Sequence, residues 1–151
     1  MALTPVAIQE GHYLANMLFN DEQPRKVDYA TVGTTVFSEP AIGACGVTEK
    51  EAKEKYGPDG YDVYESTFKP MFVQIPKRDR KSYVKLIVEK TDQQRVVGIH
   101  ILDHAAPEII QMCSVAIRAG ATKELFDHSI GIHPTSAEEI VQIRKKREKK
   151  E

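Results

Sequence analysis

The chain has 151 residues, 41% of them hydrophobic, and a formal net charge of −1 at pH 7, which suits one domain that buries roughly 70% of the surface of its unfolded chain. The near-neutral charge gives no reason to expect nucleic acid or an anionic membrane as a partner. No apolar run approaches the roughly 18 residues of a membrane-spanning helix, and residues 1–5 lack the basic and apolar parts of a signal peptide, so we expect a cytoplasmic protein.

The first predicted element is a helix. Thr4 can cap it and Pro5 suits its first turn. Small and apolar residues then recur on one face: Ala7, Gly11, Leu14, Ala15 and Leu18. Residues 29–38 are rich in Thr, Val and Phe, which predicts a strand, and Pro40 and Gly43 break it.

A short helix and three strands are predicted in the middle of the chain. Thr48 and Glu51 have the spacing of a capping box, and Gly57 ends the helix that it starts. The three strands cover residues 61–68, 83–89 and 95–102. The polar turn between the last two predicts a hairpin.

Helices predominate in the remainder. Pro107 opens one with an apolar stripe, and Gly120 stops it. A short helix at Leu125, an extended segment and a last helix from Ser136 follow. Because two of the three connections between strands are too short for a crossover helix, we expect an α+β fold with a mostly antiparallel β-sheet flanked by helices.

The segment GIHPTSAEE, from Gly131, carries the candidate chemistry. His133 precedes a proline, which keeps its backbone out of helical geometry, and Glu138 lies in the first turn of the helix that follows. A carboxylate partner fixes the tautomer of a histidine and suits it to acid–base catalysis, which is worth roughly 10²–10⁴-fold in rate. The residues alone favour a plainer interpretation: Thr135 with Glu138, or Ser136 with Glu139, forms an ordinary capping box.

Seven segments point to a family. They are, in chain order, LTPVA from Leu3, VFSEPAIG from Val36, FKPM from Phe68, VVGIH from Val96, APEIIQ from Ala106, GATK from Gly120 and HPTSAEE from His133. Together they resemble the carboxy-terminal interface domain of FAD-dependent pyridine nucleotide-disulfide oxidoreductases of the glutathione reductase/trypanothione reductase type. APEIIQ is closer to the trypanothione-type form and GATK to the glutathione-type form, so both subtypes stay open.

The resemblance implies that residues 1–144 form an interface (dimerisation) domain, followed by a charged tail at 145–151. It implies a two-fold homodimer in which His133 protonates the leaving thiolate at the partner subunit's disulfide site. Glu138 would orient that histidine, Glu139 would lie near the substrate entrance, and the His133–Pro134 bond would be cis. Thr4 would begin a helix near the flavin ring, in a full-length parent only.

The other parts of the parent chemistry are not in this sequence. It has no GxGxxG after a strand and no CxxxxC pair. Its two cysteines, Cys45 and Cys113, are expected to be buried free thiols. His100 and His104 are expected on a strand and a loop, so we expect no metal. FAD and NADPH are implied for a full-length parent, with no cofactor in the isolated chain, which we expect not to reduce disulfides.

Two hypotheses about the chain follow. In the first it is a homodimerisation domain, which pairs with itself or with a full-length reductase subunit and carries half of a composite site. In the alternative it is an engineered soluble monomeric domain, or an interface-blocking fragment, with no catalytic role. Lys69 stands where the family tends to have a small residue, and that charge would weaken an interface, whereas residues 108–112 would lie on a helix at the two-fold axis. The six basic and two acidic residues of 144–151 predict a solvated helix end.

Overall fold

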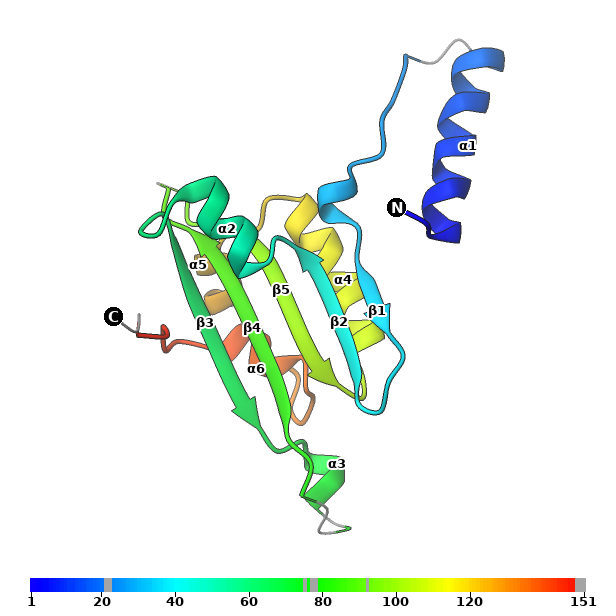
Figure 1. Cartoon of the computed structure of the whole chain (residues 1–151). Coiled ribbons are helices and arrows are strands. Elements are labelled where there is room, and N and C mark those ends of the chain that lie inside the picture. The colour runs from blue at the N-terminus through cyan, green and yellow to red at the C-terminus, as the bar shows by residue number, and fades with distance from the viewer. Residues whose placement is uncertain (21–22, 75, 77–78, 92, 149–151) are drawn as a thin grey trace. The chain divides into compact units, whose positions relative to one another are not determined.

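The computed structural model describes the whole chain except residues 21–22, 75, 77–78, 92 and 149–151. The chain divides into two compact units, Met1–Ala30 and Thr31–Glu151. The first unit contains helix α1 (Thr4–Phe19), and the second contains a β-sheet with the helices that pack on it. Figure 1 labels these elements.

Helix α1 begins at Thr4 itself, one residue earlier than the prediction of Thr4 as its cap. Leu3 has extended backbone angles and precedes the first turn, whereas Thr4 is already helical. The prediction that the Thr4 side chain caps the helix is therefore wrong. Pro5 lies in the first turn, where a residue without an N–H loses no helical hydrogen bond. On the predicted apolar face, Leu14 is 53% exposed and Leu18 is 59% exposed, so these side chains are not buried by the first unit itself.

A five-stranded sheet organises the second unit. A 3₁₀ turn (Tyr29–Thr31) precedes β1 (Thr34–Val36), β2 (Ala41–Gly46), β3 (Tyr61–Phe68), β4 (Ser82–Glu89) and β5 (Val96–Asp103). The order in the sheet is β1-β2-β5-β4-β3, and each neighbouring pair is antiparallel. Strands β3, β4 and β5 confirm the three predicted strands and their hairpin, and with the flanking helices they confirm the α+β class.

Strand β2 was not predicted. Residues 29–38, predicted as one strand, contain the 3₁₀ turn and only the short β1. Pro40 and Gly43 predict a break, but residues 41–46 pair with β5 over their whole length. Pro40 lies just before the strand, where its missing N–H costs no ladder bond. Gly43 is needed for close packing, because a Cβ there would lie 3.0 Å from the Cβ of Ile110 on the covering helix.

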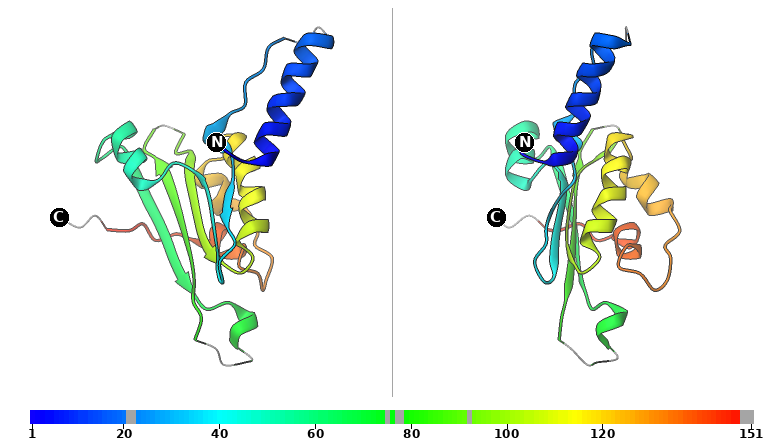
Figure 2. Two further views of the ribbon diagram at one scale, coloured as in Figure 1. Left: turned by 45° about the vertical axis from the view of Figure 1, so that its right-hand side comes forward. Right: turned by 90° about the vertical axis from the view of Figure 1, so that its right-hand side faces the viewer.

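The helices of this unit lie on both faces of the sheet. They are α2 (Glu49–Tyr56), α3 (Met71–Gln74), α4 (Ala106–Arg118), α5 (Lys123–His128) and α6 (Glu138–Gln142). Helices α4, α5 and α6 cover one face and α2 lies on the other, whereas α3 lies beyond one end of the sheet (Figures 1 and 2). The main core lies between the sheet and α4–α6, and includes Val84, Leu86, Ile99, Ile110, Phe126 and Ile140.

Local signals define the ends of several helices. The capping box of α2 forms as predicted, with the Thr48 hydroxyl accepting from the Glu51 N–H and the Glu51 carboxylate accepting from the Thr48 N–H. Gly57 and Gly120 have positive φ, 76° and 74°, where glycine is favoured, and they end α2 and α4 as predicted.

Residues 143–148, the described part of the segment after α6, do not form the solvated helix end that the charges of 144–151 predict, and residues 149–151 lie outside the described residues. Helix α6 ends at Gln142, and the chain then runs beside the outer edge of β3. Lys146 forms a β-bridge with Tyr64, and the Arg147 N–H donates to the Val63 carbonyl at 2.8 Å. The edge of β3 offers unpaired backbone groups, and these contacts satisfy some of them.

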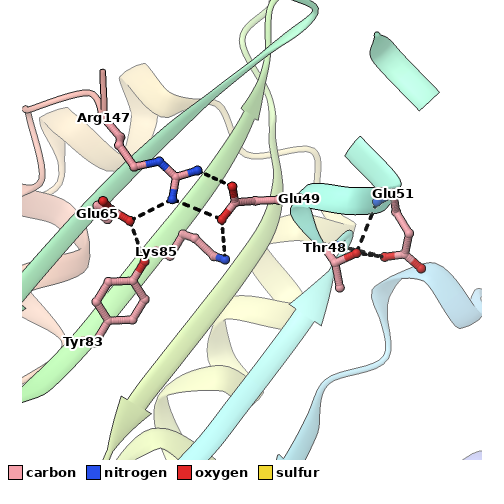
Figure 3. Close-up of polar contacts among 7 residues, drawn as sticks. All are labelled: Thr48, Glu49, Glu51, Glu65, Tyr83, Lys85 and Arg147. Carbon is pink, nitrogen blue, oxygen red and sulfur yellow. Dashed lines mark hydrogen bonds and ion pairs between the residues drawn. The ribbon is translucent and has the colours of Figure 1, made fainter. Parts of the chain in front are cut away.

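Side chains also hold this segment. The Arg147 guanidinium donates to the carboxylates of Glu49, on α2, and Glu65, on β3 (Figure 3). Lys85 also reaches Glu49, at 2.7 Å, and the Tyr83 hydroxyl donates to Glu65 at 2.6 Å. One network thus joins the C-terminal segment, α2 and two strands.

Candidate active site

His133 and Glu138 form a close pair at the start of α6. The distance between His133 Nδ1 and Glu138 Oε1 is 2.9 Å. The histidine side chain is 73% exposed and that of the glutamate only 11%. A buried carboxylate therefore holds one ring nitrogen, while the ring itself lies at the surface. With Nδ1–H donating to Glu138, Nε2 is the nitrogen left to exchange a proton with a reacting group.

The backbone of the histidine loop, residues 131–137, brings the two side chains together. The His133–Pro134 peptide is cis, which confirms the prediction. The Thr135 hydroxyl donates to the Ile132 carbonyl at 2.8 Å and accepts from the Glu138 N–H at 3.2 Å. Thr135 therefore closes the loop and binds the first amide of α6. The cap residue of α6 is Ala137, so the predicted capping box of Thr135 with Glu138 is wrong, and the Glu138 carboxylate contacts His133 instead.

Ser136 has a different partner from the predicted one. Its hydroxyl donates to the Asp103 carboxylate, at the end of β5, at 2.9 Å. The predicted capping box of Ser136 with Glu139 is therefore wrong: α6 begins at Glu138, so Ser136 precedes the cap residue Ala137. No local pattern predicts this contact, because the two residues lie 33 positions apart.

Gly131 is a second residue whose part in the site was not predicted. A Cβ built on Gly131 would lie 2.7 Å from the Cβ of Glu138. Real Cβ atoms do not approach so closely, so glycine at this position lets the glutamate backbone lie against the loop. The only signal in the sequence for this close packing is the presence of a glycine two residues before His133.

A pocket of about 240 Å³ adjoins the pair. Its lining includes His133, Glu138 and Glu139, together with Lys69 and Phe72 from the segment between β3 and β4. The structure thus brings together the three candidate residues of the histidine segment. Thr4, the fourth candidate, begins α1 in the first unit, and its role near a flavin stays a prediction.

In the described part of the chain, no three His, Cys, Asp or Glu side chains gather as ligands of a metal would. His100 lies in β5, and His104 follows it with its ring 5.8 Å from that of Phe72. None of the described helices is long and apolar enough to cross a membrane.

Residues 32–144 match the family of pyridine nucleotide-disulphide oxidoreductase dimerisation domains. The chain belongs to this family. The matched range begins one residue into the second compact unit and includes the sheet, the pocket and the histidine loop. A dimerisation domain implies a partner subunit. The boundaries 1–144 and 145–151 stay a prediction.

Helix α4 of this dimerisation domain carries exposed apolar side chains. Met112 is 67% exposed and Val115 55%, while Ile110 and Cys113 face the core. Aliphatic side chains that are half exposed on a core-packed helix suit a contact surface. The sequence prediction that residues 108–112 lie on an interface helix stays open, and this exposure is consistent with it.

The two cysteines of the dimerisation domain are buried and form no disulfide, as predicted. Burial, and to a smaller extent the neighbouring Cys45, raises the pKa of the Cys113 thiol to about 12. A thiol of this kind is almost fully protonated near neutral pH, whereas the thiolate is the reactive form. Cys113 therefore suits packing and not disulfide exchange.

Proposed function

We propose that this chain is the homodimerisation domain of a glutathione reductase/trypanothione reductase-like flavoenzyme and supplies His133 and Glu138 to the partner subunit's disulfide site. The observation that carries the proposal is the 2.9 Å contact between His133 Nδ1 and Glu138 Oε1, with the imidazole exposed beside a pocket. The seven collinear sequence segments support the subtype.

The chemistry that the pair suits is proton transfer to sulfur. When a thiolate attacks a disulfide, one S–S bond forms, the old one breaks, and the leaving sulfur departs as a thiolate. An imidazolium at His133 gives its Nε2 proton to that thiolate, which becomes a thiol, and the imidazole becomes neutral. The Glu138 carboxylate stabilises the charged ring before the transfer and fixes which nitrogen is turned outward.

Side chains of both charges line the pocket and are available to contact a substrate. Lys69 and Glu139 both line it, and so does the ring of Phe72. We propose that Glu139 contacts the substrate at the entrance to the disulfide site. Because the described lining of the pocket contains both the Lys69 ammonium and the carboxylates of Glu138 and Glu139, either glutathione disulfide or trypanothione disulfide could bind there, and both substrates belong in the test.

The first unit fits a flavin only in part. Helix α1 has 16 residues and no acidic residue in its first turn, so its N-terminus presents the partial positive charge of a helix dipole. Thr4 is therefore a reasonable neighbour for the flavin of a full-length parent. The chemistry that FAD supplies when bound is electron transfer from NADPH to a disulfide. This chain's own contribution is the proton at His133.

The experiment places the chain in a working enzyme. Residues 1–144 replace the corresponding domain of a glutathione reductase and of a trypanothione reductase, and NADPH oxidation is measured with each disulfide. We expect His133→Gln to lower kcat by roughly 10²-fold or more, which is the range of general acid–base catalysis. His128→Gln is the matched control, since this side chain is 76% exposed on α5. A flavin-loaded chimera with unchanged kcat in His133→Gln would exclude the proposed role.

A further inference from the structure

Asp103 is a buried carboxylate at the junction of three segments. It ends β5, and the residue is 1% exposed. Its Oδ1 accepts from the Ala105 N–H at 2.7 Å, and its Oδ2 accepts from the Ser136 hydroxyl at 2.9 Å. The Ser82 hydroxyl, at the start of β4, also donates to Oδ2. Both carboxylate oxygens are therefore used.

The position of this carboxylate needs an explanation, because a buried charge is costly unless several donors surround it. Of the three donors, Ser82 and Ala105 lie in the sheet and in the turn that leaves it. Ser136 lies in the histidine loop, three residues after His133 and two before Glu138. By contrast, the hydrogen bonds of Thr135 stay within the loop and α6. The Ser136–Asp103 bond ties the loop to the sheet.

We propose that Asp103 is a positioning residue for the His133–Glu138 pair and acts through Ser136. By fixing the loop between the two side chains, it keeps the Nδ1–H of His133 directed at Glu138. Its importance for catalysis rests on the proposed function, but its effect on the imidazole does not. A loop released from Asp103 would let the ring turn away from the carboxylate.

The test reads the tautomer of His133 directly. In the ¹⁵N-labelled chain, at a pH where the imidazole is neutral, the ¹⁵N shifts of the ring report which nitrogen carries the proton. We expect the Nδ1–H form to predominate in the unmodified chain. Ser136→Ala should shift the tautomer ratio toward Nε2–H by roughly threefold to tenfold, as loss of one hydrogen bond of ordinary strength would do.

Ser82→Ala is the matched control. It removes a hydroxyl that donates to the same carboxylate, and Ser82 is also buried, but Ser82 lies at the start of β4 and not in the loop. We expect it to leave the tautomer ratio unchanged. Asp103→Asn combined with Ser136→Ala should give the ratio of Ser136→Ala alone, because the aspartate acts through the serine. If Asp103 variants fail to fold, the two serine variants still decide the question.

Two outcomes would overturn the inference. One is a folded Ser136→Ala variant, with the amide spectrum of the unmodified chain, whose His133 tautomer ratio is unchanged. The other is an equal shift in Ser82→Ala, which would assign Asp103 a purely structural role. Neither readout depends on enzyme activity. A tautomer shift together with a catalytically silent His133 would therefore reject the proposed function and retain the positioning role.

Discussion

Glu138 occupies the space that a side chain at Gly131 would need, since a Cβ on that glycine would lie 2.7 Å from the Cβ of the glutamate. We expect Gly131→Ala to move α6 or the loop and so to lengthen the His133–Glu138 contact. Forced overpacking of this kind costs about 1–3 kcal/mol of unfolding free energy. Urea unfolding and the His133 ring shifts would measure the two effects.

Gly33→Ala is the control for that substitution. A Cβ there would meet its nearest atoms at 3.6 Å, an ordinary contact. We expect it to leave both the unfolding free energy and the imidazole shifts nearly unchanged. Equal effects from the two alanines would contradict the steric explanation.

The network around Arg147 should make stability sensitive to acid. Burial raises the pKa of Glu49, but the hydrogen bonds from Arg147 and Lys85 outweigh it, and the net pKa is lowered from 4.5. Because the pKa of Glu49 is lower in the folded state than in the unfolded state, ionised Glu49 adds to the unfolding free energy, and this contribution is fully present above pH 4.5. It is lost as the pH falls through the lowered pKa.

Arg147→Ala tests this network. We expect a loss of up to about 1 kcal/mol at pH 7, since the pair is partly exposed, and a flatter dependence of unfolding free energy on pH below 4.5. Lys50→Ala is the control, because its ion pair with Glu54 is long, 4.0 Å, and highly exposed. Urea titrations at several pH values would compare the two. Identical acid dependence in Arg147→Ala and the unmodified chain would reject the role of this contact.

The two cysteines should be unreactive in the folded chain. A disulfide reagent such as DTNB is expected to modify Cys45 and Cys113 slowly in buffer and rapidly in urea, because both are buried. Rapid modification of the native chain would contradict the packing described here.

Cys113 also predicts a loss of stability at high pH. Its pKa rises from 9.0 to about 12 on folding, chiefly through burial. Above pH 9 the unfolded chain loses this proton first, so the unfolding free energy falls as the pH rises toward 12. Cys113→Ala should reduce that slope. Urea titrations between pH 8 and pH 11 would show it, and an unchanged slope would count against the buried thiol.

The exposed face of α4 should control self-association. We expect Met112→Glu and Val115→Glu to weaken dimerisation by placing a charge in an apolar contact, without loss of helix content. Leu125→Glu is the control, since that side chain is 60% exposed on α5. Sedimentation velocity and circular dichroism would separate association from folding. Equal association in all variants would place the interface elsewhere.

Elements with local signals could be predicted from the sequence. The α2 capping box involves residues three positions apart, and the β4–β5 hairpin has a short polar turn. His133 and Glu138 are five positions apart on either side of a helix start, so their approach was also within reach of a local argument.

Features that depend on distant residues could not be predicted. A glycine such as Gly43 usually indicates a break in a strand. Here it lies within β2, where the absence of a side chain lets α4 pack closely against the strand. The C-terminal segment has the charges of a helix end, but its partners on β3 are more than 80 positions away. The hydrogen bond between Ser136 of the histidine loop and Asp103 also joins residues that are distant in the sequence, so it could not be predicted either.

The solution mass of the chain tests the central claim most directly. Sedimentation equilibrium over a concentration series should give twice the chain mass of 17.0 kDa, as expected for a dimerisation domain that presents His133 to a partner. A mass of 17.0 kDa at every concentration would contradict self-association and favour the alternative of a monomeric or interface-blocking domain.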